Sequence, residues 1–415
     1  MNQVTQRLSN LRRQIGSTVE TNIVSGTIKQ SISEKIKFSQ SSGKKKTDKE
    51  IAALVGGHVF ETGLILIRNV YPLSTLHKCY DSSDFHQTPY LTKSNSIEDI
   101  LFIDTETTGL STASGTLVFL IGAAEIKGKQ LILEQLLLTK IAAEKKLLHW
   151  FQNKCSQKKL FASYNGKSFD IPLLETRFKM HRIKYTFCDE HIDLLHWVRR
   201  LHKNVLPNCN LPTAEKFCLN FSRNNDLPGS EAPRIWQEIL KFHSYDQVPS
   251  LIKHHANDII SLAGLLHYCE EAISVSLNKE MTKSSIDIFS LASYFCRSKN
   301  YLTALNILEN NKLSLNDNAN FLLSTLYRKK NKISLALPIW HELSTRGHYA
   351  STENLAKYFE HNAKDYDQAL FFTCQLISQY PQSSNAQHRR YRLQQKLNRS
   401  LFPPTTSPHP RLRSI

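Results

Sequence analysis

Two acidic residues follow an apolar run in the segment ILFIDTETTG, residues 100–109. Because side chains two apart on a strand point to the same face, the carboxylates of Asp104 and Glu106 should converge. Converging buried carboxylates are unfavourable unless a cation neutralises them. Mg²⁺ and Mn²⁺ prefer such oxygen ligands, so the spacing predicts divalent-metal chemistry. The hydroxyl and backbone N–H groups that follow could bind a phosphate or sugar; they belong to Thr107, Thr108 and Gly109.

Two later segments carry further acids. SYNGKSFDIPLLETRF places Asp170 at a predicted strand-to-helix junction, where Asp is also a common helix cap. HHANDIISL places Asp258 four residues after His254 and three after His255, so an imidazole and a carboxylate can share a helix face. Each pattern alone also fits solvated surface residues. The three segments in this order are more specific than any one.

In this order the segments resemble the three motifs of the DEDD exonucleases in the ribonuclease H-like superfamily. FIDTETTGL looks like the first motif, YNGKSFDIPLL like the second and HHANDIISL like the third. The stretches GLILIRNVYPL, LPNCNLPTAEKF and DLPGSEAPRIW resemble the YprB-like branch of that superfamily. The resemblance covers roughly residues 51–273 and implies a divalent-metal-dependent 3′–5′ exonuclease.

The resemblance also implies roles for individual residues. Four acids would ligate two Mg²⁺ or Mn²⁺ ions, which can activate water and stabilise the leaving oxygen of an in-line attack. These acids are Asp104, Glu106, Asp170 and Asp258. His254 is favoured as the base for the attacking water, because its position matches that of the branch; His255 stays the alternative. Asn165 joins the threonines and glycine of the first segment as a predicted substrate-binding residue.

The charge and the absence of targeting signals limit the partners. The 415 residues include 53 Lys and Arg against 36 Asp and Glu, a net charge of +17. This favours nucleic acid first and a membrane surface second; with the resemblance, we expect a single-stranded 3′ end. No stretch approaches the ~20 apolar residues that a spanning helix needs, and no secretory signal is recognisable. Eight cysteines without a C-x-x-C motif favour free thiols in the cytoplasm.

Two other functions remain open. One is a non-catalytic nucleic-acid-binding or scaffold protein that uses a nuclease fold, which the four acids and a suitable histidine disfavour. The other is an endonuclease of the same fold, which the motifs do not separate from an exonuclease. The sequence also does not distinguish DNA from RNA.

The patterns predict an α/β domain with a ribonuclease H-like mixed sheet flanked by helices, followed by an all-α region. Strands are expected over 100–106, 116–126 and 131–138, and a helix over 191–201. The expected segments are a basic, disordered start (1–50), a strand-containing extension (51–99), the nuclease domain (100–275), helical repeats (285–395) and a basic, disordered tail (396–415).

The repeats rest on three alanines in similar helical patterns. Ala304, Ala336 and Ala369 are 32 and 33 residues apart, near the period of tetratricopeptide helix pairs. Such repeats would bind a protein partner; an ordinary helical bundle is the alternative. In the nuclease domain, Asp193 is expected to start a helix, and Gly122 to allow a close approach or a bulge.

Overall fold

The computed structural model describes residues 44–76, 91, 96–109, 115–188, 190–278 and 286–401. The chain divides into two compact units, Met1–Ser274 and Val275–Ile415. The predicted basic segments at the two ends lie largely outside the described residues, as do positions 110–114 of the loop after Gly109.

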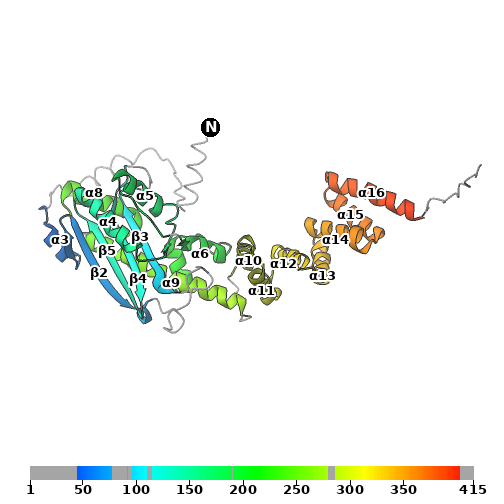
Figure 1. Cartoon of the computed structure of the whole chain (residues 1–415), viewed down its shortest axis with the longest axis horizontal. Coiled ribbons are helices and arrows are strands. Elements are labelled where there is room, and N and C mark those ends of the chain that lie inside the picture. Colours follow the sequence, from blue (N-terminus) through cyan, green and yellow to red (C-terminus); the bar gives the residue numbers. More distant parts are fainter. Residues whose placement is uncertain are drawn as a thin grey trace, which may run out of the picture. The chain divides into compact units, whose positions relative to one another are not determined.

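The first unit is built on a seven-stranded sheet in the order β1-β2-β5-β4-β3-β6-β7 (Figure 1). Neighbouring strands are antiparallel from β1 through β3, and β3, β6 and β7 are parallel. The mixed sheet predicted from the sequence is therefore confirmed. The strands are β1 (His58–Glu61), β2 (Leu64–Pro72), β3 (Ile100–Thr107), β4 (Val118–Lys127), β5 (Gln130–Leu138), β6 (Leu160–Ser163) and β7 (Glu190–Asp193).

The central strands are apolar because both of their faces are covered. In β4 the first seven residues are buried, and in β3 the first four are, which is typical of strands between two layers of helices. Helices flank the sheet (Figure 1). They are α3 (Asp48–Leu54), α4 (Glu144–Cys155), α5 (Asp170–Met180), α6 (Leu194–His202), α7 (Leu211–Cys218), α8 (Ala232–Phe242) and α9 (Val248–Leu277), with 3₁₀ turns η1 (Leu73–Thr75), η2 (Ile97–Asp99), η3 (Ile141–Ala143) and η4 (Gly229–Glu231).

The structure adds to the sequence-based predictions in two regions of the sheet. The strands before residue 100 are present, and β2 pairs with β5, so they extend the same sheet. The helix predicted over 191–201 is wrong at its start, because residues 190–193 pair with the edge of β6 as β7. Helix α6 then begins at Leu194, and Asp193 caps it by accepting a hydrogen bond from the backbone N–H of Leu195, as expected for a helix-start residue.

The described part of the second unit is all-helical, as predicted, and neighbouring helices pack in chain order. Ala304, Ala336 and Ala369 are fully buried on α11, α13 and α15. Helix α16 continues beyond the predicted boundary at residue 395. The helices are α10 (Ile288–Arg297), α11 (Tyr301–Asn310), α12 (Asp317–Lys329), α13 (Ile333–Thr345), α14 (Tyr349–Tyr358), α15 (Tyr366–Gln379) and α16 (Ser384–Leu401), with a 3₁₀ turn η5 (Lys312–Ser314) and a π turn η6 (Phe359–Ala363).

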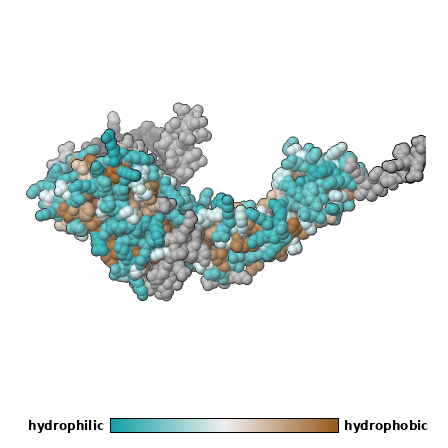
Figure 2. Space-filling view, viewed as in Figure 1, coloured by the Kyte–Doolittle hydropathy of each residue, from teal (hydrophilic) through white to brown (hydrophobic). Residues whose placement is uncertain are grey.

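The surface of both units is mainly hydrophilic on the face that Figure 2 shows, and hydrophobic residues occur there in separate patches. Among the described residues, no helix combines the length and the apolar character that crossing a bilayer requires. The seven cysteines in the described part of the chain are free thiols.

Candidate active site

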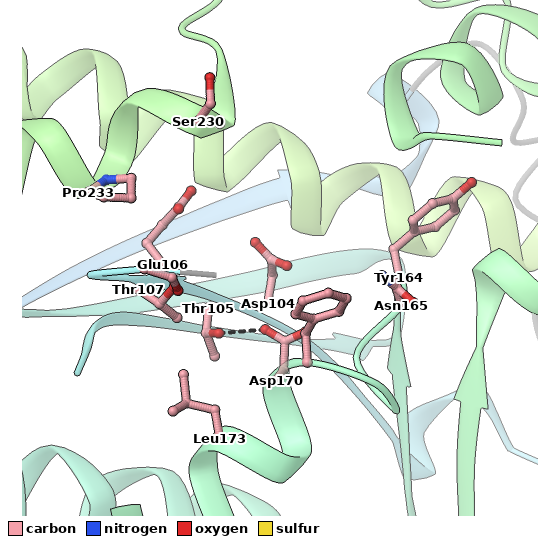
Figure 3. A pocket seen from close by; sticks show the side chains of 13 residues that line it. Asp104, Thr105, Glu106, Thr107, Tyr164, Asn165, Asp170, Leu173, Ser230 and Pro233 are labelled. Atoms are coloured by element: carbon pink, nitrogen blue, oxygen red, sulfur yellow. Dashed lines mark hydrogen bonds between the residues drawn. The ribbon is translucent and has the colours of Figure 1, made fainter. Parts of the chain in front are cut away.

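The two acids of the first segment lie on β3, beside a pocket of about 510 Å³. Asp104 pairs in register with Gly122 of β4, and Glu106 pairs with Leu120. Figure 3 shows Asp104, Glu106 and Asp170 around this pocket. The pocket is lined by Asp104, Thr105, Glu106, Thr107, Gly109, Tyr164, Asn165, Phe169, Asp170, Leu173, Gly229, Ser230 and Pro233.

Asp170 is the first residue of α5, and its carboxylate faces β3. The N-cap position belongs to Phe169, which makes no side-chain capping bond. The Asp170 Oδ1 atom instead accepts a hydrogen bond from the hydroxyl of Thr105 (Figure 3). Its carboxylate is therefore directed at the other acids and does not act as the helix cap.

The turn that leads to Asp170 is held by a second buried acid. Asp193, 2 % exposed, accepts hydrogen bonds from the backbone N–H groups of Asn165 and Lys167. Asn165 has a φ of 64°, a left-handed conformation that asparagine tolerates better than most residues. Asp193 thus links the start of α6 to the pocket wall, in addition to its predicted capping role.

Helix α9 brings the third segment to the same place. The Nε2 atom of His254 lies 3.4 Å from Oδ2 of Asp258, one helical turn away. One ligand atom each from Glu106, His254 and Asp258 lie within 4.8 Å of one another. The structure thus brings all five residues predicted to carry the chemistry to one site, from β3, α5 and α9.

Burial raises the pKa of all four clustered carboxyl groups, and repulsion within the cluster adds to this for two of them. For Asp104 and Glu106 the pKa lies well above the usual range, first because of burial and then because of the neighbouring acids. Burial raises the pKa of Asp170 to about 6 and also raises that of Asp258. Acids that repel one another in this way are a suitable environment for divalent cations, which would remove the repulsion.

The second histidine of α9 packs against the sheet and does not line the pocket, although its Nε2 atom lies 3.6 Å from Oδ2 of Asp104. His255 is fully buried, with Nε2 3.1 Å from the carbonyl oxygen of Asp104 and Nδ1 2.9 Å from Nε2 of Gln135. The Gln135 amide also donates to the carbonyl of Ile252. Burial lowers the pKa of His255 to about 3. Both ring nitrogens of this neutral histidine are therefore used to fasten α9 to β3 and β5.

Gly122 provides the space for this attachment. It lies between Asp104 and Gln135 in the strand register. A Cβ at this position would overlap the side chains of Ile259 and His255. The predicted close approach at Gly122 is confirmed, and the approaching element is α9.

The predicted substrate-binding residues separate into two groups. Thr107, Gly109 and Asn165 line the pocket, whereas Thr108 does not. The Thr108 hydroxyl accepts a hydrogen bond from the N–H of Leu117 at 2.9 Å, and its own N–H donates to the Leu117 carbonyl. Thr108 therefore closes the base of the loop that follows β3.

Several residues at the site were not predicted from the sequence. Phe169 lies in the pocket wall with 37 % of its surface exposed, and its place directly before Asp170 was an available signal. Arg223 and Asp226 lie between α7 and α8, where no periodic pattern marks them. Arg223 donates from Nη2 to Oδ1 of Asp258 at 2.5 Å, so this acid already has a cationic partner.

The chain is similar to one known superfamily and to one curated protein over most of its length. The RNase H superfamily model matches residues 101–270. The uncharacterized protein YprB of Bacillus subtilis (strain 168) is 32 % identical over 342 residues, which cover 77 % of this chain and 82 % of that protein. Among solved structures, the family B DNA polymerase from the archaeon Pyrobaculum calidifontis matches at a TM-score of 0.35 and 10 % identity. That match covers 69 % of this chain and 36 % of the polymerase.

Proposed function

The chain belongs to the YprB family and carries an RNase H superfamily domain, and on this premise we propose that it is a divalent-metal-dependent 3′–5′ exonuclease of the DEDD type. Its reaction would be hydrolysis of phosphodiester bonds in nucleic acid with a single-stranded 3′ end. The observation that carries the proposal is the convergence of four carboxyl groups with raised pKa values at one site. Glu106 and Asp170 are buried, and Asp104 and Asp258 are partly buried.

The donor set suits hard divalent cations. Oxygen ligands from three elements meet at the site, and the repulsion between them is the kind that a cation removes. Two Mg²⁺ or Mn²⁺ ions would activate the attacking water and stabilise the leaving oxygen. The residues that would hold them are Asp104, Glu106, Asp170 and Asp258.

His254 is the proposed base because of where its Nε2 atom lies. The ring is close to Glu106 and Asp258, at the edge of the cluster, and only 7 % of the residue is exposed. A neutral imidazole in this place can accept the proton of an attacking water. His255 is a poor candidate, because both of its nitrogens are engaged in the packing of α9.

The pocket walls offer contacts for a terminal nucleotide. Thr107, Gly109 and Asn165 contribute polar groups to the pocket lining, and Phe169 contributes a partly exposed ring. A base that has left its duplex can stack on such a ring, a contact that contributes about 1–3 kcal/mol per base. This combination favours an unpaired end over an intact duplex.

We propose that the second unit binds a protein partner through tetratricopeptide-like repeats. Helices pack in chain order, and the three alanines with near-34 spacing are fully buried, each on the second helix of a successive pair. Apolar side chains on the same second helices are exposed, including Leu302 at 60 % and Phe371 at 61 %. Such residues are available for contact with another protein.

The test is a substrate panel with the full chain. Single-stranded DNA and RNA with a 5′ label, the same strands with a blocked 3′ end, and a circular single strand are incubated with Mg²⁺, Mn²⁺ or excess EDTA. We expect a ladder of products shortened one nucleotide at a time from the free 3′ end. Blocked and circular strands should stay intact, and EDTA should stop the reaction.

The other outcomes each exclude the proposal. Cleavage of the circular strand would identify an endonuclease. Binding without cleavage under all metal conditions would identify a non-catalytic protein. Cleavage in excess EDTA would exclude metal-dependent hydrolysis, and the Asp104→Asn variant controls for contaminating nucleases.

A further inference from the structure

We infer that Asp226 is a positioning residue that fixes the ring of His254, and that Arg223 ties this acid to Asp258. The inference rests on the proposed function, because the proton transfer that gives His254 a task belongs to that reaction. Asp226 lies outside the three motifs and does not line the pocket.

The contact between the two residues determines the form of the imidazole. His254 Nδ1 lies 2.8 Å from Oδ2 of Asp226, and Arg223 Nη1 donates to the same oxygen at 2.8 Å. Arg223 Nη1 also lies 3.3 Å from Nδ1, farther than the carboxylate oxygen. Burial opposes the charge on Asp226, but the hydrogen bonds from Arg223 and His254 prevail and lower its pKa. An ionised carboxylate at this distance requires a proton on Nδ1. In the neutral ring, Nε2 is then the proton acceptor, and it is the nitrogen that faces Asp258.

Arg223 makes the position of Asp226 depend on that of Asp258. Its side chain is 6 % exposed, and its guanidinium donates to Glu215 as well as to Asp226 and Asp258. It occupies Oδ1 of Asp258 and leaves Oδ2 facing His254. One planar, rigid cation therefore sets the separation between the proposed base and the proposed ligand.

Gly229 limits the ring from its other side. A Cβ built on Gly229 would lie 3.3 Å from Nε2 of His254, and Gly229 itself lines the pocket. The short stretch from Asp226 to Gly229 thus binds one nitrogen of the imidazole and approaches the other. A ring held in this way by a carboxylate has one tautomer and one orientation, as is common where histidine serves as a ligand or base.

The competing explanation is a buried ion-pair network that only stabilises the fold. The two explanations differ in what they require of His254. If Asp226 works through His254, its removal should have little effect on rate once His254 is absent. If it only stabilises the fold, its removal should lower activity by the same factor in both backgrounds.

The experiment is a double-mutant cycle in the full chain with Asp226→Asn, His254→Ala and the double variant. On the oligonucleotide that the wild type shortens best, Asp226→Asn should lower kcat by about 10²-fold, because the wrong tautomer removes most of the benefit of a positioned base. KM should change less than threefold, a small uniform-binding effect. In the His254→Ala background the same substitution should change kcat by less than about twofold. Asp246→Asn, an exposed acid of the same unit, is the matched control.

A second readout does not depend on activity. In metal-free protein with ¹⁵N-labelled histidine, long-range ¹H–¹⁵N spectra report which ring nitrogen carries the proton, and His254→Ala identifies the signal. We expect Nδ1–H in the wild type and a shift toward the other tautomer in Asp226→Asn. Mn²⁺ affinity should stay within about threefold, since no proposed ligand is removed.

Three results would overturn the inference: Nε2–H as the main tautomer of the wild type, an unchanged tautomer in Asp226→Asn, or equal kcat losses in both backgrounds. Failure of the proposed function gives a different result. A wild type that cleaves no substrate excludes the nuclease, whereas the tautomer spectra still decide whether Asp226 orients His254.

Discussion

The acids of the site differ in the positive charge that lies beside them. Three of them line the pocket between β3 and α5, and the fourth lies on α9. Asp104, Glu106 and Asp170 line the same pocket. Burial raises the pKa of all three, and repulsion from the neighbouring acids of the cluster raises those of Asp104 and Glu106 further. Asp258 on α9 is instead bound to the guanidinium of Arg223. Asp104, Glu106 and Asp170 are thus suited to binding cations from solution. Asp258 already has a positive neighbour in the guanidinium of Arg223.

The two histidines of α9 also differ in the part of the protein that each contacts. His255 turns toward the sheet and uses both nitrogens to bind β3 and β5. His254 turns toward the loop after α7 and keeps one nitrogen facing the acids. Neighbouring residues of one type can therefore have separate tasks, one in folding and one in chemistry, depending on the element that each faces.

The largest effect on activity is expected from a substitution of Asp104 on β3. Asp104→Asn keeps the size of the side chain and removes a charge that a divalent cation needs, so cleavage should fall below detection in Mg²⁺ and Mn²⁺. The wild type should gain thermal stability when Mn²⁺ is added, because a ligand that binds the folded state stabilises it. The variant should lose that gain. A variant that keeps both activity and the Mn²⁺-induced rise in Tm would show that Asp104 is not a ligand.

The next effect concerns the base. His254→Ala should lower kcat by about 10²–10⁴-fold, the usual contribution of a positioned general base. The Mn²⁺-induced rise in Tm should remain, because the four acids are still present. Single-turnover rates and thermal melts of the same preparation measure both quantities. If the Mn²⁺ response disappears together with activity, His254 acts as a ligand and the division between base and ligands is incorrect.

A smaller effect, on stability, is expected where α9 meets the sheet. Gly122→Ala introduces a Cβ that overlaps Ile259 and His255, so the free energy of unfolding should fall by about 3 kcal/mol, the upper end for overpacking. Urea denaturation measures this value. Gly115→Ala is the matched control, because a Cβ at Gly115 meets no atom within 4 Å. Equal stability of the two variants would contradict the described packing of α9 on β4.

The smallest effect should come from His255→Phe, which replaces the imidazole by an apolar aromatic ring without hydrogen-bonding nitrogens. The Gln135 amide then loses one of its two partners, and the loss of stability should be about 1–2 kcal/mol. The kcat value should fall far less than with His254→Ala. If His255→Phe is inactive while His254→Ala is near normal, the two histidines have the opposite tasks.

The sequence predicted the elements whose signal is local. Strands β3 to β5 follow from long apolar runs. The convergence of Asp104 and Glu106 follows from their spacing on a strand, whereas their grouping with Asp170 and Asp258 came from the resemblance to the DEDD exonucleases. Strand β7 was missed because it has four residues, and only pairing with the edge of β6 makes it a strand. The spacing of Ala304, Ala336 and Ala369 could also be read from the sequence, because a repeat is a regular pattern along the chain.

The finer parts of the site depend on contacts between distant residues. His254 and His255 lie four and three positions before Asp258, and both offsets are compatible with one helix face. Only the location of the sheet decides which ring is buried. Arg223 and Asp226 lie in irregular chain, where no period indicates a partner 28 or 35 residues away.

The fit of His255 over Gly122 also has a consequence for how related sequences can diverge. A side chain larger than hydrogen at position 122 is compatible with α9 only if the side chains at positions 255 and 259 both make room, so these three positions should change together during evolution. The side chains of the four acids are not the atoms that a Cβ at position 122 would meet. On the proposed function, their loss would abolish catalysis and leave the packing of α9 on β4 in place. A relative that keeps glycine and histidine here but lacks the acids would therefore be recognisable as a pseudoenzyme that has preserved the architecture.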